Sequence, residues 1–295
     1  IVPRSENSSL LVNGIQYDGA ISIYAKGSDI HVVNELSIEQ FIASMLAKDF
    51  IYPLESEVMS AIAILARTSA YYHGKNNQSL WHIDAIEAGY VGSYLQTPRS
   101  LIDKVIKDTQ GLILVYAKEG QNEPFPATWT EHSAGKTATF GAIFRKEALC
   151  PSISRPTPHA LSDRQDSSWS FTISKEALAK KCGMHSVESV ELFLDHESNK
   201  SYAIRLTGAS EKKDLSFFAL QKHLGKEALQ SNDFTVEIEG EEIVFEGFGK
   251  GHGVGLCLYS ASLLAEKGEN ALQMLTKFYP HTSLYNLTVK SPKNQ

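Results

Sequence analysis

Short alternations of hydrophobic and polar positions over residues 10–36 predict strands, and the period changes to that of a helix after Ser37. The apolar runs of the first part are Leu10–Val12, Ile21–Tyr24 and Ile30–Val33. The pair Asn13-Gly14 stands between apolar runs, which is a hairpin signal. The apolar positions with helical spacing are Ile38, Phe41, Ile42, Met45 and Leu46. Because Ser37 stands three residues before Gln40, the capping-box spacing fixes the predicted helix start.

Helices and strands continue to alternate along the rest of the chain. Residues 56–72 predict a second helix, rich in alanine and aliphatic residues and so buried on most sides. A third helix is expected over 98–109, strands over 112–116 and 137–144, and a final helical pair over 256–279 that breaks at Gly268. Residues 150–168 contain three prolines and five serines and predict a surface segment. The segment 169–243 predicts an α+β module of its own, with helices over 175–181 and 215–224.

Composition narrows the class of protein. The chain has 295 residues, of which 42% are hydrophobic and 21% charged, which is typical of a globular protein. Its net charge of −6 argues against nucleic-acid binding. Three scattered cysteines exclude a dense disulfide framework, and no apolar run approaches the ~18 residues of a membrane span. The chain begins without Met, so we expect the exported part of a cell-envelope protein, with any anchor or signal peptide outside it.

Two charged residues fall at positions where the helical pattern predicts apolar ones. Asp49 continues the stripe of the first helix, four residues after Met45, where partial desolvation and the helix C-terminus both raise the pKa of a carboxyl group. That is the preparation a general acid needs, although the acid also fits a position that turns to solvent as the helix ends. Arg67 lies in the alanine-rich second helix and needs a carboxylate or an anionic ligand. An internal ion pair, to Glu57 or Asp49, is the alternative.

Two further segments carry polar groups in unusual settings. Five glycines alternate strictly from Gly247 to Gly255, which fits an extended segment with one bare face onto which something packs or binds. A tight turn entering the last helix is the alternative, but His252 lies at the centre of the run. The second segment includes His132, Ser133 and Lys136, and it is either a site that hydrogen-bonds a sugar or peptide or an ordinary loop.

Together these segments resemble the stage II sporulation protein D family, SpoIID/LytB, over nearly the whole chain. The segments that carry the resemblance run from Ile38-Glu39-Gln40-Phe41 to Arg67-Thr68-Ser69-Ala70-Tyr71, and include His132-Ser133-x-Gly135-x-Thr137, Leu224-Gly225 to Phe234, and Gly249-x-Gly251-His252-Gly253-Val254-Gly255. In the family a Glu stands eighteen residues before the Arg and acts as the catalytic acid. Here that position is Asp49, one methylene shorter.

The resemblance implies a peptidoglycan lytic transglycosylase. Asp49 would be the catalytic residue, and Arg67, His132, Ser133, Lys136 and His252 would bind substrate. The substrate implied is glycan stripped of its stem peptides, with an N-acetylmuramoyl-L-alanine amidase as partner and a place in the cell envelope. We expect no cofactor, and no zinc, because Ala134 replaces the cysteine found in some relatives. The alternatives are a non-catalytic protein that binds denuded glycan and an amidase enhancer.

Resemblance and element pattern together predict the architecture. We expect an α+β fold in which residues 1–165 and 244–295 form the main domain. Residues 166–243 form a smaller inserted α+β domain. Asp49, Arg67, the His132 segment and the Gly-His loop are expected to meet in one cleft.

Overall fold

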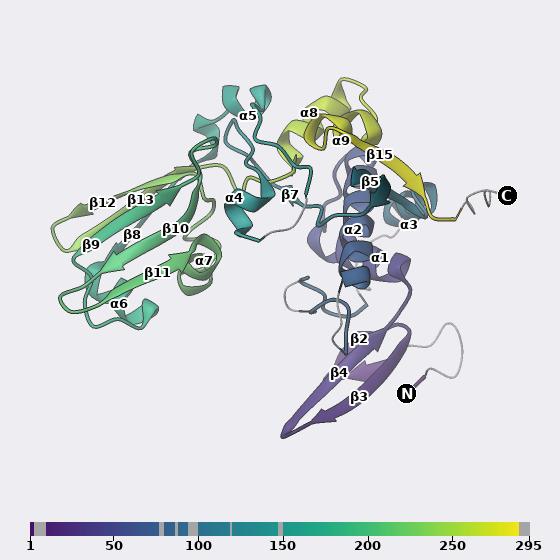
Figure 1. Cartoon of the computed structure of the whole chain (residues 1–295), viewed down its shortest axis with the longest axis horizontal. Helices are drawn as coiled ribbons and strands as arrows, with labels where there is room; N and C mark the ends of the chain where they lie inside the picture. The colour runs from purple at the N-terminus through teal and green to yellow at the C-terminus, as the bar shows by residue number, and fades with distance from the viewer. Residues whose placement is uncertain are drawn as a thin grey trace. The chain divides into compact units, whose positions relative to one another are not determined.

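The computed structural model describes residues 1–2, 10–76, 80–85, 88–93, 100–118, 120–146 and 150–288. The chain divides into two compact units (Figure 1). Unit 1 contains residues 1–127, 270–272 and 282–295, and unit 2 contains residues 128–269 and 273–281. Both units contain helices and strands, so the predicted α+β class is confirmed. The unit bounds differ from the predicted domain boundaries at 165 and 243, and that division stays a prediction.

Three helices form the centre of unit 1. They are α1 (Ile38–Asp49), α2 (Ser56–Asn76) and α3 (Ser100–Asp108). The predicted capping box opens α1: the Gln40 N–H donates to Ser37 Oγ at 3.2 Å, and the Ser37 N–H donates to Gln40 Oε1 at 3.1 Å. The apolar stretch of α2 from Val58 to Leu65 is buried, as its composition predicts.

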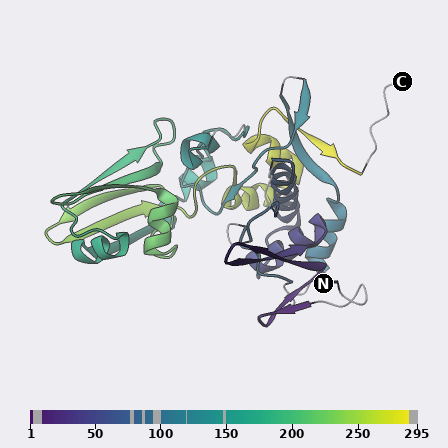
Figure 2. The same cartoon turned by 60° about the horizontal axis from the view of Figure 1, so that its bottom comes forward.

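The strands of unit 1 form antiparallel pairs and one small sheet. They are β1 (Leu10–Val12), β2 (Ile15–Tyr17), β3 (Ala20–Lys26), β4 (Asp29–Glu35), β5 (Leu112–Lys118), β6 (Gln121–Glu123) and β15 (Thr282–Asn286). The predicted hairpin at Asn13-Gly14 joins β1 to β2, and both turn residues have positive φ, 50° and 77°. Figure 2 shows β5 running beside the yellow β15, and β5 is the central strand of the sheet β15-β5-β6.

The helices and strands of unit 2 that lie before residue 163 or after residue 255 are short. They are β7 (Trp129–Thr130), α4 (Phe140–Phe144), α5 (Pro158–Ser162), β14 (Leu256–Cys257), α8 (Leu258–Glu266) and α9 (Ala271–Phe278), whose first two residues fall in unit 1. β7 pairs in parallel with β14. The strand expected over 137–144 is wrong: Phe140–Phe144 is helical, because Thr139 Oγ1 accepts the Ala142 N–H and caps the turn. The helical pair broken at Gly268 is confirmed.

The segment between residues 168 and 248 has two antiparallel three-stranded sheets. Its elements are β8 (Ser168–Ser174), α6 (Lys175–Cys182), β9 (Ser189–Leu194), β10 (Ser201–Thr207), β11 (Lys212–Ser216), α7 (Phe217–Leu224), β12 (Phe234–Glu239) and β13 (Glu242–Phe248). The strand orders are β12-β13-β8 and β11-β10-β9. One hydrophobic cluster has all its buried members between Trp169 and Phe245, so this segment builds a core from its own residues.

Among the described residues, no helix combines the length and hydropathy required to cross a membrane.

Candidate functional site

Asp49 is the last residue of α1, and its side chain is 39% exposed. The helix ends here, with Phe50 as C-cap, so the carboxylate leaves the apolar stripe that would have buried it. Lys48 Nζ lies 3.9 Å from Asp49 Oδ1, at the outer limit of an ion pair. Asp49 is therefore more hydrated than its place in the pattern predicts, and it is accessible to a ligand. The C-terminal end of a helix disfavours its negative charge.

Arg67 is fully buried and uses all five of its N–H donors. Its Nε donates to Glu39 Oε1 at 2.9 Å and its Nη2 to Glu39 Oε2 at 2.7 Å. Nη1 donates to the carbonyl oxygens of Ala63 and Leu112, and the second Nη2–H points to Thr109 Oγ1 at 3.4 Å. The internal ion pair that was the alternative for Arg67 is present, but its partner is Glu39 and not Glu57 or Asp49. Binding of substrate by Arg67 stays a prediction. This geometry does not favour it, because all N–H donors of Arg67 are used within the protein and its side chain has no exposed surface for a ligand to contact.

Glu39 escaped the sequence-based selection because a carboxylate in the first turn of a helix is ordinary. Glu57, an alternative partner in the sequence analysis, instead accepts the Ala271 N–H at 2.8 Å. The Arg67–Glu39 pair ties the start of α1 to the middle of α2, and Arg67 also reaches Thr109 and the first residue of β5. This clamp fixes the helix that carries Asp49 at its other end.

The glycine run in unit 2 packs against the chain itself. Gly249, Gly251, Gly253 and Gly255 all have positive φ, between 70° and 96°. A Cβ atom at Gly249 would lie 2.5 Å from the carbonyl oxygen of His132, and one at Gly251 would lie 2.5 Å from Thr130 Oγ1. The bare face predicted from the alternation therefore exists, and residues 128–134 cover much of it.

The two candidate histidines have the same local geometry. Nδ1 of His132 accepts the Ala134 N–H at 3.1 Å, and Nδ1 of His252 accepts the Val254 N–H at 3.1 Å. An imidazole that accepts at Nδ1 carries its proton at Nε2, so each ring presents Nε2–H as a donor. Burial lowers the pKa of His132, and it lowers the pKa of His252 to about 4. Both rings are neutral at pH 7 and suited to hydrogen bonding rather than to ion pairing.

Ser133 and Lys136 have partners within the protein. Ser133 is fully buried and its Oγ lies 2.7 Å from Thr157 Oγ1, so the side chain has no surface with which to meet a glycan in this structure. Lys136 is partly exposed, and its Nζ donates to the carbonyl oxygen of Glu197. The sequence-based assignment of both to substrate binding stays a prediction, and the burial of Ser133 speaks against its part.

A buried charge cluster beside the His132 segment was not expected from the sequence. Lys200 is 1% exposed, and its Nζ donates to Asp233 Oδ2 at 2.8 Å and to the Ser133 carbonyl oxygen at 3.0 Å. Arg164 shares the same carboxylate, at 2.8 Å from Nη2 to Asp233 Oδ1. Burial raises the pKa of Asp233, but Lys200 and Arg164 outweigh it, so the pKa is lowered overall. The signal in the sequence was weak, because the three residues come from distant segments.

The predicted site residues divide between the units. Asp49 and Arg67 lie in unit 1, whereas His132, Ser133, Lys136 and His252 lie in unit 2. A single cleft that unites Asp49 with His252 joins both units and stays a prediction. Within the described ranges, no group of three or more His, Cys, Asp or Glu side chains is placed to hold a metal ion.

Comparison with known proteins places the first part of the chain. Residues 26–116 match the family model SpoIID, stage II sporulation protein. This match contains both Asp49 and Arg67 and ends before His132.

Among the individual relatives, those with the higher sequence identity cover less than half of the chain, and those that cover most of the chain are 25% identical or less. An uncharacterized protein of Chlamydia pneumoniae is 39% identical over 95 residues, which is 31% of this chain and 35% of that protein. An uncharacterized protein of Brachyspira hyodysenteriae is 25% identical over 91% of this chain and 72% of its own length. The stage II sporulation protein D of Bacillus amyloliquefaciens is 22% identical over 89% of this chain and 78% of its own length.

The alignments span little more than a third of the two chlamydial relatives, 35% of one and 41% of the other. The family model nevertheless matches the region that holds α1 and α2. The alignment with the Bacillus amyloliquefaciens protein, which covers 89% of this chain, is to a protein that bears the family's name. The sequence motifs point to the same family. The match of residues 26–116 to the SpoIID model and the alignment with a stage II sporulation protein D support membership of the SpoIID family, and with it a cell-wall-related role.

Proposed function

We propose that the chain is a lytic transglycosylase that cleaves denuded peptidoglycan between N-acetylmuramic acid and N-acetylglucosamine. In its acid form Asp49 donates a proton to the glycosidic oxygen, and the bond from C1 to that oxygen breaks. The Asp49 carboxylate then takes the proton of the muramic C6 hydroxyl, while O6 bonds to C1 and closes a 1,6-anhydro ring. The proton lost by Asp49 is regained, no water is consumed, and one carboxylate suffices, unlike the two of glycoside hydrolases.

The observation that carries the proposal is the place of Asp49. It is an accessible carboxylate at the end of a helix whose start is held by the Arg67–Glu39 pair. A reacting group gains from a rigid mount, because misplacement by about 1 Å costs ~10²-fold in rate. We assign Asp49 the proton transfers and Arg67 the positioning of the helix. His132 and His252 would donate from Nε2 to glycan oxygens.

A second candidate function is binding of denuded glycan without cleavage, or enhancement of an amidase. The 39% exposure of the Asp49 side chain favours it, because a hydrated carboxylate lacks the burial that keeps a general acid protonated near neutral pH. The shorter side chain also changes the reach of the acid by roughly 1 to 1.5 Å, the length of one carbon–carbon bond. In either case we propose a place in the cell envelope and an amidase that supplies the denuded strands.

The experiment is digestion of denuded peptidoglycan by the wild-type chain and by Asp49→Ala. Mass spectrometry of the soluble products distinguishes 1,6-anhydro ends from hydrolysed ends. We expect 1,6-anhydro products from the wild type and a loss of about 10²-fold or more in the variant. Equal yields from both proteins would refute the role of Asp49. Binding without any product would support the second candidate.

A further inference from the structure

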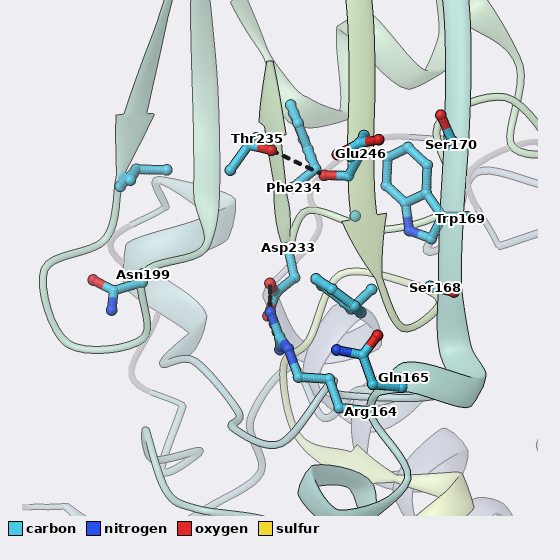
Figure 3. A pocket seen from close by; sticks show the side chains of 13 residues that line it. Arg164, Gln165, Ser168, Trp169, Ser170, Asn199, Asp233, Phe234, Thr235 and Glu246 are labelled. Carbon is cyan, nitrogen blue, oxygen red and sulfur yellow. Dashed lines mark hydrogen bonds and ion pairs between the residues drawn. The ribbon is translucent and has the colours of Figure 1, made fainter. Parts of the chain in front are cut away.

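A pocket of about 600 Å³ opens in unit 2, at the end of the sheet formed by β12, β13 and β8 (Figure 3). Its volume lies in the range of sites for small organic ligands. Four separate segments contribute side chains to it: the turn before β8, the end of β9 with the following turn, the start of β12 and the end of β13. None of the residues proposed above to act on glycan lines it.

Arg164 lies at one end of this pocket, where contacts within the protein hold its guanidinium group in place and leave two N–H donors for a ligand. Its Nη1 and Nη2 bind Asp233 at 3.2 and 2.8 Å, and Nη1 also donates to the carbonyl oxygen of Ala134. The guanidinium carbon lies 4.2 Å from the centre of the Phe248 ring. Within the part of the chain that the structure describes, the Nε–H and the second Nη2–H have no acceptor, and they lie on one edge of the planar group. Such an edge matches both oxygens of a carboxylate.

The charges around the pocket give a ligand a direction. Asp233 is shared between Arg164 and the buried Lys200, so two cations face one carboxylate at this end. Glu246 lies at the opposite end (Figure 3), exposed and with no cation partner among the described residues. The ligand therefore meets an anion-binding edge at one end and a hydrogen-bond acceptor at the other.

Neutral polar groups and an apolar wall complete the lining. The amides of Gln165 and Asn199 are exposed, and no described residue hydrogen-bonds to either side chain. Trp169 and Phe234, each 7% exposed, contribute apolar surface. Amides beside a carboxylate and an apolar wall suit hydroxyl and acetamido groups, which both donate and accept.

We propose that this pocket binds a carboxylate-bearing N-acetylated saccharide. The sugar carboxylate lies on the free edge of Arg164, and sugar hydroxyls bond to Gln165, Asn199 and Glu246. The inference rests on the proposed function for the source of such a sugar, a glycan strand with muramic acid residues. It adds a holding site on unit 2 that takes no part in the chemistry.

Isothermal titration calorimetry tests the proposal on the full chain carrying Asp49→Ala. This variant lacks the proposed catalytic acid, so the measured heat reports binding and not cleavage. The probes are the disaccharide of N-acetylglucosamine and N-acetylmuramic acid, and N,N′-diacetylchitobiose, which lacks the carboxylate. We expect the acidic disaccharide to bind about tenfold more tightly, as a charge-assisted bidentate contact allows. Arg164→Lys, which removes the edge but keeps the charge, should abolish this preference. Arg205→Lys is the matched control, because Arg205 makes a bidentate pair with Asp214 outside the pocket.

A second pair of variants guards against misfolding of Arg164→Lys. Glu246→Gln should weaken both probes severalfold, whereas Glu237→Gln, on the neighbouring strand and also exposed, should leave both unchanged. Equal affinity for the two probes in the parent chain would overturn the proposal. So would preferential binding of an acidic tetrapeptide, which would assign the pocket to a peptide. If the wild-type chain cleaves no glycan while the Asp49→Ala chain still binds the acidic disaccharide, only the proposed function is refuted. If the wild-type chain cleaves glycan but the pocket shows no such binding, only the pocket proposal is refuted.

Discussion

Replacing Glu39 with Gln removes the counter-charge of the buried Arg67 while it keeps the shape of the side chain. In the native chain Glu39 accepts from Arg67 Nε at 2.9 Å, from Arg67 Nη2 at 2.7 Å and from the Gly111 N–H at 3.4 Å. The amide of Gln keeps one oxygen and places an NH₂ donor against a guanidinium that is fully buried. An unpaired buried charge costs about 3–5 kcal/mol. Glu39 itself is 21% exposed, so we expect the lower part of that range.

The matched control is Glu123→Gln in the same unit. Glu123 pairs with Lys75, whose side chain is 56% exposed, and such surface pairs contribute at most about 1 kcal/mol. Urea unfolding monitored by circular dichroism gives the two free energies, and hydrogen exchange in α1 assigns the loss to unit 1. Restoring neutrality with Glu39→Leu combined with Arg67→Met should recover much of the loss. Equal destabilisation by Glu39→Gln and Glu123→Gln would refute the claim that the pair is a buried clamp.

Three further results are expected. Gly255→Ala should destabilise unit 2 by about 2–5 kcal/mol in urea unfolding, because a Cβ atom there would meet a backbone carbonyl and a buried tyrosine hydroxyl. Gly240 also has positive φ but faces open space, so Gly240→Ala should cost only about 1–2 kcal/mol. The pKa of His252 is about 4 in the folded chain and about 6.5 in the unfolded chain, so the unfolded state binds the proton first as the pH falls. The free energy of unfolding should therefore fall by roughly 2–3 kcal/mol from pH 6.5 to pH 4. In thermal melting measured as a function of pH, His252→Gln should make this fall smaller. Ser133→Ala should lower the melting temperature and leave the KM for glycan unchanged, and a raised KM without loss of stability would show that Ser133 binds substrate.

Local chemistry made the elements of unit 1 predictable. Ser37 and Gln40 form a reciprocal cap, and Asn13-Gly14 adopts the positive φ that a tight hairpin requires, so a few residues decide each element. The strand expected over 137–144 failed for the same kind of reason. A single hydroxyl, Thr139 Oγ1, caps a helical turn that apolar spacing alone does not reveal.

The candidate site was predictable only where one helix carries the information. The spacing placed Asp49 at the end of α1, but helix termination, which decides its exposure, depends on the chain that follows. The partner of Arg67 comes from a different helix, 28 residues earlier, and its choice over Glu57 depends on tertiary packing. The burial of Lys200 was still harder to predict from the sequence. The carboxylate that pairs with it belongs to Asp233, which lies 33 residues later, in the connection before another strand.

The alternation of glycines is the intermediate case. Its regularity predicted a bare face, and the sequence left open whether a ligand or the chain would cover it. The structure answers with the carbonyl of His132 and the hydroxyl of Thr130, groups that no pattern in the glycine segment specifies.

The proposed catalytic role of Asp49 is tested most directly by mass spectrometry of the products that the wild type, Asp49→Glu and Asp49→Ala release from denuded glycan. We expect 1,6-anhydro ends, lighter by one water molecule than hydrolysed ends, from the wild type and from Asp49→Glu, and none above background from Asp49→Ala. Product from Asp49→Ala at the wild-type level would contradict this role, as would products of the wild type that all carry hydrolysed ends.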